Sequence, residues 1–122
     1  MIAAGFGFRK EATPDSLQDA YARARQSAQV DVLATVDDKA HTTVFCDFAA
    51  AQGVAARPIP GDLLRDQTPT TQSAASYKTY GTGSVAEAAA LAAAGPGARL
   101  ITTRQTSADR LATCALAIRE TQ

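Results

Sequence analysis

Residues 30–36 read Val-Asp-Val-Leu-Ala-Thr-Val, and this β-branched stretch decides the fold because it predicts a strand that ends at an acidic turn. Before it, Thr13 is in position to cap a helix that starts at Pro14 and continues with apolar residues at helical spacing. Residues 2–6 predict an earlier, short strand that breaks at the glycines of residues 5–7. The chain therefore opens with a predicted β-α-β unit, whose two strands are parallel.

The rest of the chain continues the alternation of helices and strands. The expected elements are a helix over residues 42–52, a strand over 54–59, an alanine-rich helix over 85–94, and strands over 99–103 and 111–118. Residues 61–83 are the least regular part, and we expect only short helices there, near Leu63 and across residues 73–80. The link over residues 104–110 is too short for a helical crossover, so the last two strands should be antiparallel.

These elements indicate one domain of the α/β class. The sequence has 122 residues, which is the length of one ordinary domain, and 46% of them are hydrophobic, which is enough to build a core. We therefore predict a single three-layer α/β/α domain over residues 1–122, with a mainly parallel mixed sheet whose last strand is antiparallel.

Charge and hydropathy exclude several classes of function. Lys plus Arg and Asp plus Glu number 12 each, so the chain lacks the basic excess of proteins that bind nucleic acid or anionic membranes. The most apolar run, residues 88–94, is too short to span a bilayer, and the N-terminus does not have the pattern of a signal peptide. Cys46 and Cys114 lack metal-site spacing and are expected to be reduced core residues. We expect a cytoplasmic protein with no nucleic-acid or membrane partner.

The set of reactive side chains is small. His41 is the single histidine, so a Ser-His-Asp site or a multi-histidine metal centre would have to depend on it alone. A dinucleotide fingerprint is incomplete, because Lys10 stands where the pattern begun by Gly5 and Gly7 needs a third glycine. Glu87 follows a serine at the spacing of a capping box, which favours a structural role for its carboxylate. We predict no catalytic residue, no cofactor and no metal site.

Cations follow the predicted carboxyl ends of the strands, which is where open α/β sheets bind ligands. Arg9 and Lys10 come after the first strand, Lys39 after the second, and Arg104 after the fourth. The glycine N–H groups just before Arg9 and the helix start that follows would add dipoles that attract anions. This pattern favours a polyanionic small molecule as ligand. The alternative is that these cations are solvated side chains at loop ends.

Four segments together resemble the CobE proteins and the C-terminal domain of CbiG, a family of cobalamin biosynthesis. They occur in the family's order and spacing over essentially the whole chain, which makes the combination more specific than any single piece. The segments are Gly5-Phe6-Gly7-Phe8-Arg9-Lys10-Glu11-Ala12-Thr13, Leu33-Ala34-Thr35-Val36-Asp37-Asp38-Lys39-Ala40, Ser84-Val85-Ala86-Glu87-Ala88-Ala89-Ala90-Leu91 and Thr113-Cys114-Ala115-Leu116-Ala117.

The resemblance implies a protein of the corrin ring pathway, whose ligand is a modified tetrapyrrole with several acetate and propionate carboxylates. In that case Arg9, Lys10, Lys39 and Arg104 would pair with the ring carboxylates, and the turn from Gly5 to Gly7 would let the backbone approach the macrocycle. The function that this implies is a carrier or chaperone that binds a corrinoid or precorrin intermediate and passes it between pathway enzymes.

Two alternatives come from other classes of function. CbiG, the two-domain member of the family that the chain resembles, hydrolyses the ring lactone of a cobalt-precorrin-5A intermediate with loss of a two-carbon aldehyde. For this chain to do the same, Asp37 or Glu87 would have to act as the general base. The other alternative is an interaction module that docks on a pathway enzyme and binds no ligand itself.

Overall fold

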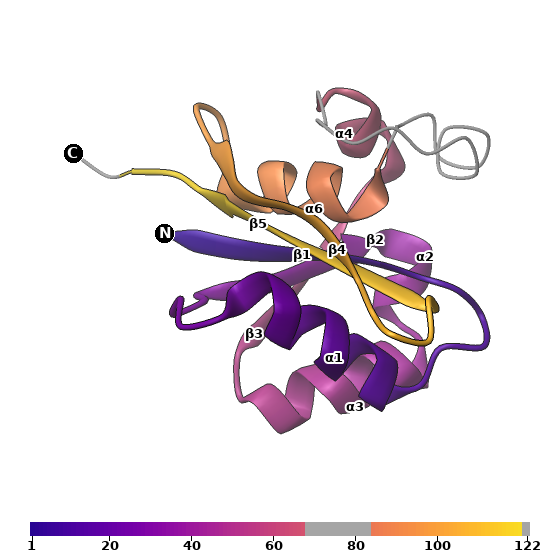
Figure 1. The fold of residues 1–122 in the computed structure, drawn as a ribbon. Coiled ribbons are helices and arrows are strands. Elements are labelled where there is room, and N and C mark those ends of the chain that lie inside the picture. Colours follow the sequence, from indigo (N-terminus) through magenta and orange to yellow (C-terminus); the bar gives the residue numbers. More distant parts are fainter. Residues whose placement is uncertain (68–83, 121–122) are drawn as a thin grey trace.

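Strand β1 (Ile2–Phe8) lies at the centre of a five-stranded sheet with the strand order β3-β2-β1-β5-β4 (Figure 1). The computed structural model describes residues 1–67 and 84–120. In chain order, the other elements are α1 (Pro14–Arg25), β2 (Val32–Val36), α2 (Asp37–Ala40), α3 (Thr43–Gln52), β3 (Ala55–Ile59), α4 (Gly61–Arg65), α6 (Val85–Ala94), β4 (Arg99–Thr106) and β5 (Ala112–Ile118).

One strand runs against the other four. β1 pairs in parallel with β2, and β2 with β3, whereas β5 is antiparallel to both of its neighbours, β1 and β4. This confirms the predicted mainly parallel mixed sheet with an antiparallel last strand. The carboxyl ends of β1 to β4 therefore share one edge of the sheet with the amino end of β5. We call this edge the strand-end rim; it comprises residues 8–12, 37–41, 60–61 and 104–111.

The predicted helix ends have the expected caps. Thr13 Oγ1 accepts the N–H of Ser16 while the Ser16 hydroxyl accepts the N–H of Thr13, so a reciprocal capping box begins α1 at Pro14. α3 ends at Gly53, whose φ of 67° lies in the left-handed region that glycine adopts without strain. The helix predicted over residues 42–52 is thus confirmed, and a separate short helix, α2, replaces the turn expected after β2.

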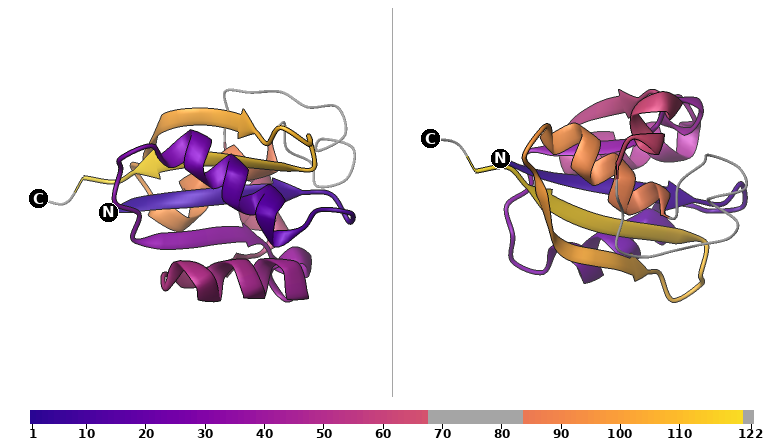
Figure 2. Two further views of the ribbon diagram at one scale, coloured as in Figure 1. Left: turned by 60° about the horizontal axis from the view of Figure 1, so that its bottom comes forward. Right: turned by 90° about the horizontal axis from the view of Figure 1, so that it is seen from above.

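Helices cover both faces of the sheet, as the three-layer prediction requires (Figures 1 and 2). On one face, α1 and α3 enclose an aromatic core whose neighbouring ring centroids lie between 5.1 and 6.4 Å apart. Its members are Phe6, Tyr21, Phe45 and Phe48. On the other face, α6 buries a run of alanines against the sheet. Aromatic rings fill the core beneath α1 and α3, whereas the core beneath α6 is formed by small side chains and a close approach of the helix backbone to the sheet.

α6 lies so close to β1 that only glycine fits where they cross. A Cβ atom added to Gly5 would lie 2.1 Å from the carbonyl oxygen of Ala86 and 2.3 Å from the amide nitrogen of Ala90. Gly5 is in the middle of a continuous strand, paired with Ala34 on one side and Ala115 on the other. The strand break predicted at the two glycines is therefore wrong, because Gly5 makes room for a helix rather than for a turn.

β4 extends to Thr106, beyond the end predicted from the sequence, and its ladder with β5 is irregular. Thr102 pairs with Leu116 and Gln105 with Cys114, so two residues of β4 face one residue of β5 in a β-bulge. Arg104 is one of the two bulged residues. The expectation that Arg104 follows the strand is therefore wrong: it lies inside β4.

The remaining local predictions concern the short helices within residues 61–83 and the two cysteines. The short helix expected near Leu63 is present as α4, and the one expected over residues 73–80 lies outside the described residues. Cys114 is buried, and burial raises the pKa of its thiol. Cys46 is exposed, not in the core, because it follows the buried Phe45 by one residue and so points away from the apolar face of α3.

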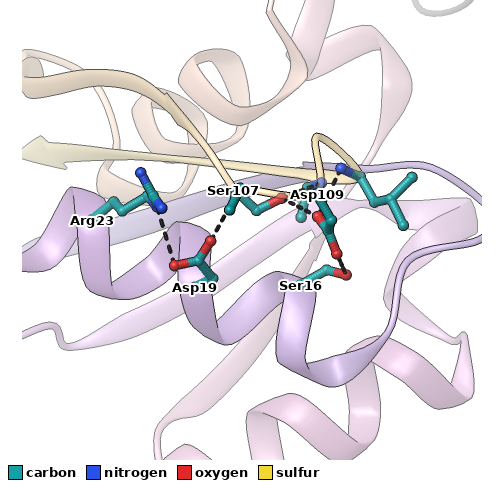
Figure 3. A network of polar contacts seen from close by, with 8 residues as sticks. Ser16, Asp19, Arg23, Ser107 and Asp109 are labelled. Atoms are coloured by element: carbon teal, nitrogen blue, oxygen red, sulfur yellow. Dashed lines mark hydrogen bonds and ion pairs between the residues drawn. The ribbon is translucent and has the colours of Figure 1, made fainter.

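A polar network joins α1 to the loop between β4 and β5, next to the strand-end rim (Figure 3). The Asp109 carboxylate accepts hydrogen bonds from the hydroxyls of Ser107 and Ser16, both at 2.6 Å. Asp19, one turn further along α1, accepts a backbone N–H of the same loop at 2.7 Å and pairs with Arg23 at 3.1 Å. The Ser107 hydroxyl is the main cause of a lowered pKa at Asp109, and the loop N–H is the main cause at Asp19.

Gly5→Ala should destabilise the protein strongly, because the new methyl group meets helix backbone, which cannot move aside as a flexible side chain can. We expect a loss of about 3 kcal/mol in the free energy of unfolding, measured by urea denaturation. Gly61→Ala is the matched control: the nearest atom to its added Cβ is Arg65 Nη1 at 3.8 Å, and the change should stay within about 0.5 kcal/mol. Equal stability of the two variants would contradict the packing role of Gly5.

Asp109→Asn should reduce the dependence of stability on pH in acid. Because the folded-state pKa of Asp109 is lowered, its stabilisation is complete above the unfolded pKa of about 4 and is lost as the pH falls through the lower, folded value. We therefore expect a shallower fall of the unfolding free energy below about pH 4 in this variant. Asp47→Asn, at an exposed position of α3, is the control. An unchanged pH slope in Asp109→Asn would show that the network does not stabilise the fold.

Candidate functional site

Arg9 and Lys10 mark the point where the chain leaves β1 at the strand-end rim. The N–H of Arg9 donates to the carbonyl of Leu111 at 2.8 Å, and the carbonyl of Arg9 accepts the N–H of Ala12 at 3.0 Å, which closes a tight turn. Both cationic side chains are exposed. Because α1 begins just beyond this turn, the positive end of its dipole lies at the same edge of the sheet.

Lys39 is brought to the same part of the rim by α2. This short helix starts directly after β2, and the Lys39 ammonium lies 4.9 Å from the centroid of the Phe8 ring. Phe8 is in turn stacked on Phe45, with ring centroids 6.1 Å apart and an interplanar angle of 4°. A cation over an aromatic face is attracted by the ring quadrupole. Phe8 therefore holds the Lys39 ammonium at the last residue of β1, directly before the turn that carries Arg9.

Arg104 lies apart from these three cations. It is on the edge strand β4, and β5 separates β4 from β1, so the two backbones are roughly 10 Å apart across the sheet. Its side chain is half-buried, whereas Arg9 and Lys10 are exposed. The four cations predicted from the strand ends thus divide by position. Arg9, Lys10 and Lys39 follow the neighbouring strands β1 and β2, and we refer to them as one group; Arg104 is separated from them by β5.

The two predicted glycines lie against protein atoms. Gly5 is buried beneath α6. Gly7 accepts a hydrogen bond from Thr113 Oγ1 at 3.1 Å through its carbonyl, and a Cβ added there would lie 3.4 Å from the Val85 side chain. We therefore assign both glycines to packing and leave them out of the ligand site proposed below.

Two buried polar residues near the rim have contacts that the sequence did not reveal. Thr35 donates its hydroxyl to the carbonyl of Phe6 at 2.8 Å and so ties β2 to β1. The Glu87 carboxylate is fully buried, and its Oε2 accepts the N–H of Arg104 at 2.8 Å. Ser84 does cap α6 through the N–H of Glu87, but the bond to Arg104 is not part of a capping box. The feature of the sequence that could have indicated a special role for Glu87 is that it is a single charged residue in the otherwise apolar helix α6.

The sequence match covers nearly the whole fold. Residues 2–117 match the family described as Cobalamin synthesis G C-terminus. The chain belongs to this family. The resemblance to CobE and to the C-terminal domain of CbiG is thereby confirmed, as is the predicted relation to cobalamin biosynthesis. No curated protein matches the chain.

Solved structures show the same fold. The crystal structure of CobE, a protein from the cobalamin (vitamin B12) biosynthetic pathway, is similar with a TM-score of 0.88 and 28% identity, covering 100% of this chain and 92% of that one. The cobalamin biosynthesis protein chiG from Agrobacterium tumefaciens str. C58 gives a TM-score of 0.76 and 31% identity, covering 99% of this chain and 100% of that one. A cobalamin biosynthesis protein G homolog from Sulfolobus solfataricus, at 19% identity and a TM-score of 0.70, shares the fold over 98% of this chain and 37% of its own.

No helix within residues 1–67 and 84–120 combines the length and the hydropathy that crossing a bilayer requires.

Phe8→Leu should release Lys39 while leaving the turn at Arg9 in place, because leucine keeps apolar bulk but has no ring quadrupole. We expect the NMR signals of the Lys39 methylene protons next to the ammonium to lose the ring-current shift that the Phe8 ring imposes. The corresponding signals of Lys10, on the neighbouring turn, are the internal control. If the Lys39 signals do not change, the ammonium does not lie over Phe8 in solution.

Proposed function

We propose that this chain binds a corrinoid or precorrin intermediate through the carboxylates of the ring and carries it between enzymes of cobalamin biosynthesis. Membership of the family and the likeness to CobE support the pathway. The observation that carries the binding role is the group formed by Arg9, Lys10 and Lys39 at the strand-end rim. These cations follow the ends of two neighbouring strands, at the edge where α/β sheets bind their ligands.

The chemistry of the group suits carboxylates. The Arg9 guanidinium can form two parallel hydrogen bonds to one carboxylate, and the Lys10 and Lys39 ammonium groups supply point charges beside it. The contact with Phe8 reduces the side-chain freedom that Lys39 would lose on binding. The net charge of the chain is zero, so the attraction of an anion depends on this local group.

A macrocycle with carboxylates around its edge would also reach along the sheet. Arg104, on the far side of β5, lies in that direction. We propose it as a second contact for the same ligand, opposite the group at Arg9.

The hydrolase alternative would depend on Asp37 or Glu87. Asp37 is exposed, and its Oδ1 lies 3.6 Å from Nε2 of His41, which is also exposed. Glu87 is fully buried and bonded to the N–H of Arg104, which supports a structural role for it. Asp37 is not sheltered, and the Glu87 carboxylate already accepts a backbone N–H, so we favour the carrier over the hydrolase.

The test is an absorbance titration of the purified protein with a late corrinoid intermediate that carries free carboxylates, followed by gel filtration. We expect coloured ligand to co-elute unchanged with the protein. Arg9→Ala and Lys39→Ala should each weaken binding about tenfold, because each removes a charge-assisted hydrogen bond to the ligand. Added salt should weaken binding to the wild type, since Arg9 and Lys10 are exposed.

Arg99→Ala is the matched control, because Arg99 begins β4 at the edge of the sheet opposite the rim and its side chain forms an exposed ion pair with Glu120. Its affinity should equal that of the wild type. Unchanged affinity in both Arg9→Ala and Lys39→Ala would overturn the site. Conversion of a lactone-bearing intermediate with release of a two-carbon aldehyde would establish the hydrolase instead, and failure of any intermediate to bind would favour the docking module.

A further inference from the structure

Glu87 and Arg104 connect the buried face of the sheet with the strand-end rim. Glu87 is in the first turn of α6, and its carboxylate is fully buried between the helix and the sheet. Arg104 is on the edge strand β4. The 2.8 Å hydrogen bond from the Arg104 N–H to Glu87 Oε2 is a contact between a side chain of one layer and the backbone of another.

The bulge explains why this backbone N–H needs a side-chain acceptor. Thr102 pairs with Leu116 and Gln105 with Cys114, so Arg104 has no partner residue in the ladder with β5. A bulged residue leaves the regular hydrogen-bond pattern of its strand. The Glu87 carboxylate accepts this N–H in a charge-assisted bond, which is stronger than a bond between neutral groups.

The position of Glu87 favours a carboxylate there. It lies in the first turn of α6, where the helix dipole attracts negative charge, and it is the only charged residue of that helix. Most of the other residues of this helix are alanines, whose side chains have no hydrogen-bonding atoms. A carboxylate at this position can accept the backbone N–H of Arg104, which an alanine side chain cannot do.

We infer that Glu87 is a positioning residue for ligand binding: it holds the bulge of β4 in the conformation that presents the Arg104 guanidinium to a ligand carboxylate. This inference rests on the proposed function, and it adds a residue that does not touch the ligand. Glu87 acts through Arg104, whereas Arg9, Lys10 and Lys39 are held by β1 and α2 and do not depend on it.

The test is a double-mutant cycle measured with the corrinoid titration described above. Glu87→Ala and Arg104→Ala should each weaken binding about tenfold. If Glu87 acts through Arg104, the double variant should bind within roughly twofold of Arg104→Ala alone. In the matched cycle with Lys39→Ala the two effects should multiply, because Lys39 is held by a different contact. An equal loss from Glu87→Ala in the wild-type and Arg104→Ala backgrounds would overturn the inference, since it would reveal a general effect on the fold.

Glu87→Gln covers the case in which the alanine variant does not fold. The glutamine side-chain oxygen can still accept the Arg104 N–H, so binding should recover to within roughly twofold of the wild type. The NMR signal of the Arg104 amide proton gives a readout that needs no ligand: it should shift in Glu87→Gln, as a carboxylate acceptor is replaced by an amide. An unchanged amide signal would overturn the inference. Failure of the wild type to bind any corrinoid would overturn the proposed function instead, and the amide signal would still decide whether Glu87 holds Arg104.

Discussion

The contact between β1 and α6 at Gly5 is the constraint on which the rest of the structure depends. A helix made almost entirely of alanine has little side-chain area to bury, so it stabilises the fold only if its backbone lies directly on the sheet. The absence of a Cβ at Gly5 permits this approach. The approach in turn decides how far the Glu87 side chain reaches, and that side chain bonds the backbone of β4. One missing methyl group at the centre of the sheet thus sets the geometry of its edge.

Local signals in the sequence identified most elements, because caps act within a few residues. Thr13 and Ser84 begin their helices, and Gly53 ends α3, each through contacts with the adjacent turn of its own helix. Gly5 was misinterpreted because the atoms that require it belong to a helix far along the chain. A glycine pair beside a basic turn has the same appearance whether it makes a turn or admits a helix. Only the tertiary packing distinguishes the two.

The candidate site was predictable to a similar degree. The cations could be identified because they follow strand ends, and strand ends are visible in the sequence. Their grouping could not, because it depends on the contact of Lys39 with Phe8 and on the bulge that contains Arg104. Irregularities in a ladder arise from pairing between strands, and a single strand's sequence does not show them. The role of Glu87 was hidden for the same reason, since its partner is a backbone group of another element.

Both borders of the sheet are interrupted. β3, on one side, contains Pro58, which has no N–H to offer to a further strand, and β4, on the other, departs from regular register in two places. Neither border is a flat template on which a second chain could add a strand. A domain of this design resists lateral polymerisation even when it is abundant, because these backbone features add to the charges of Arg57 and Arg99 on the same edge strands.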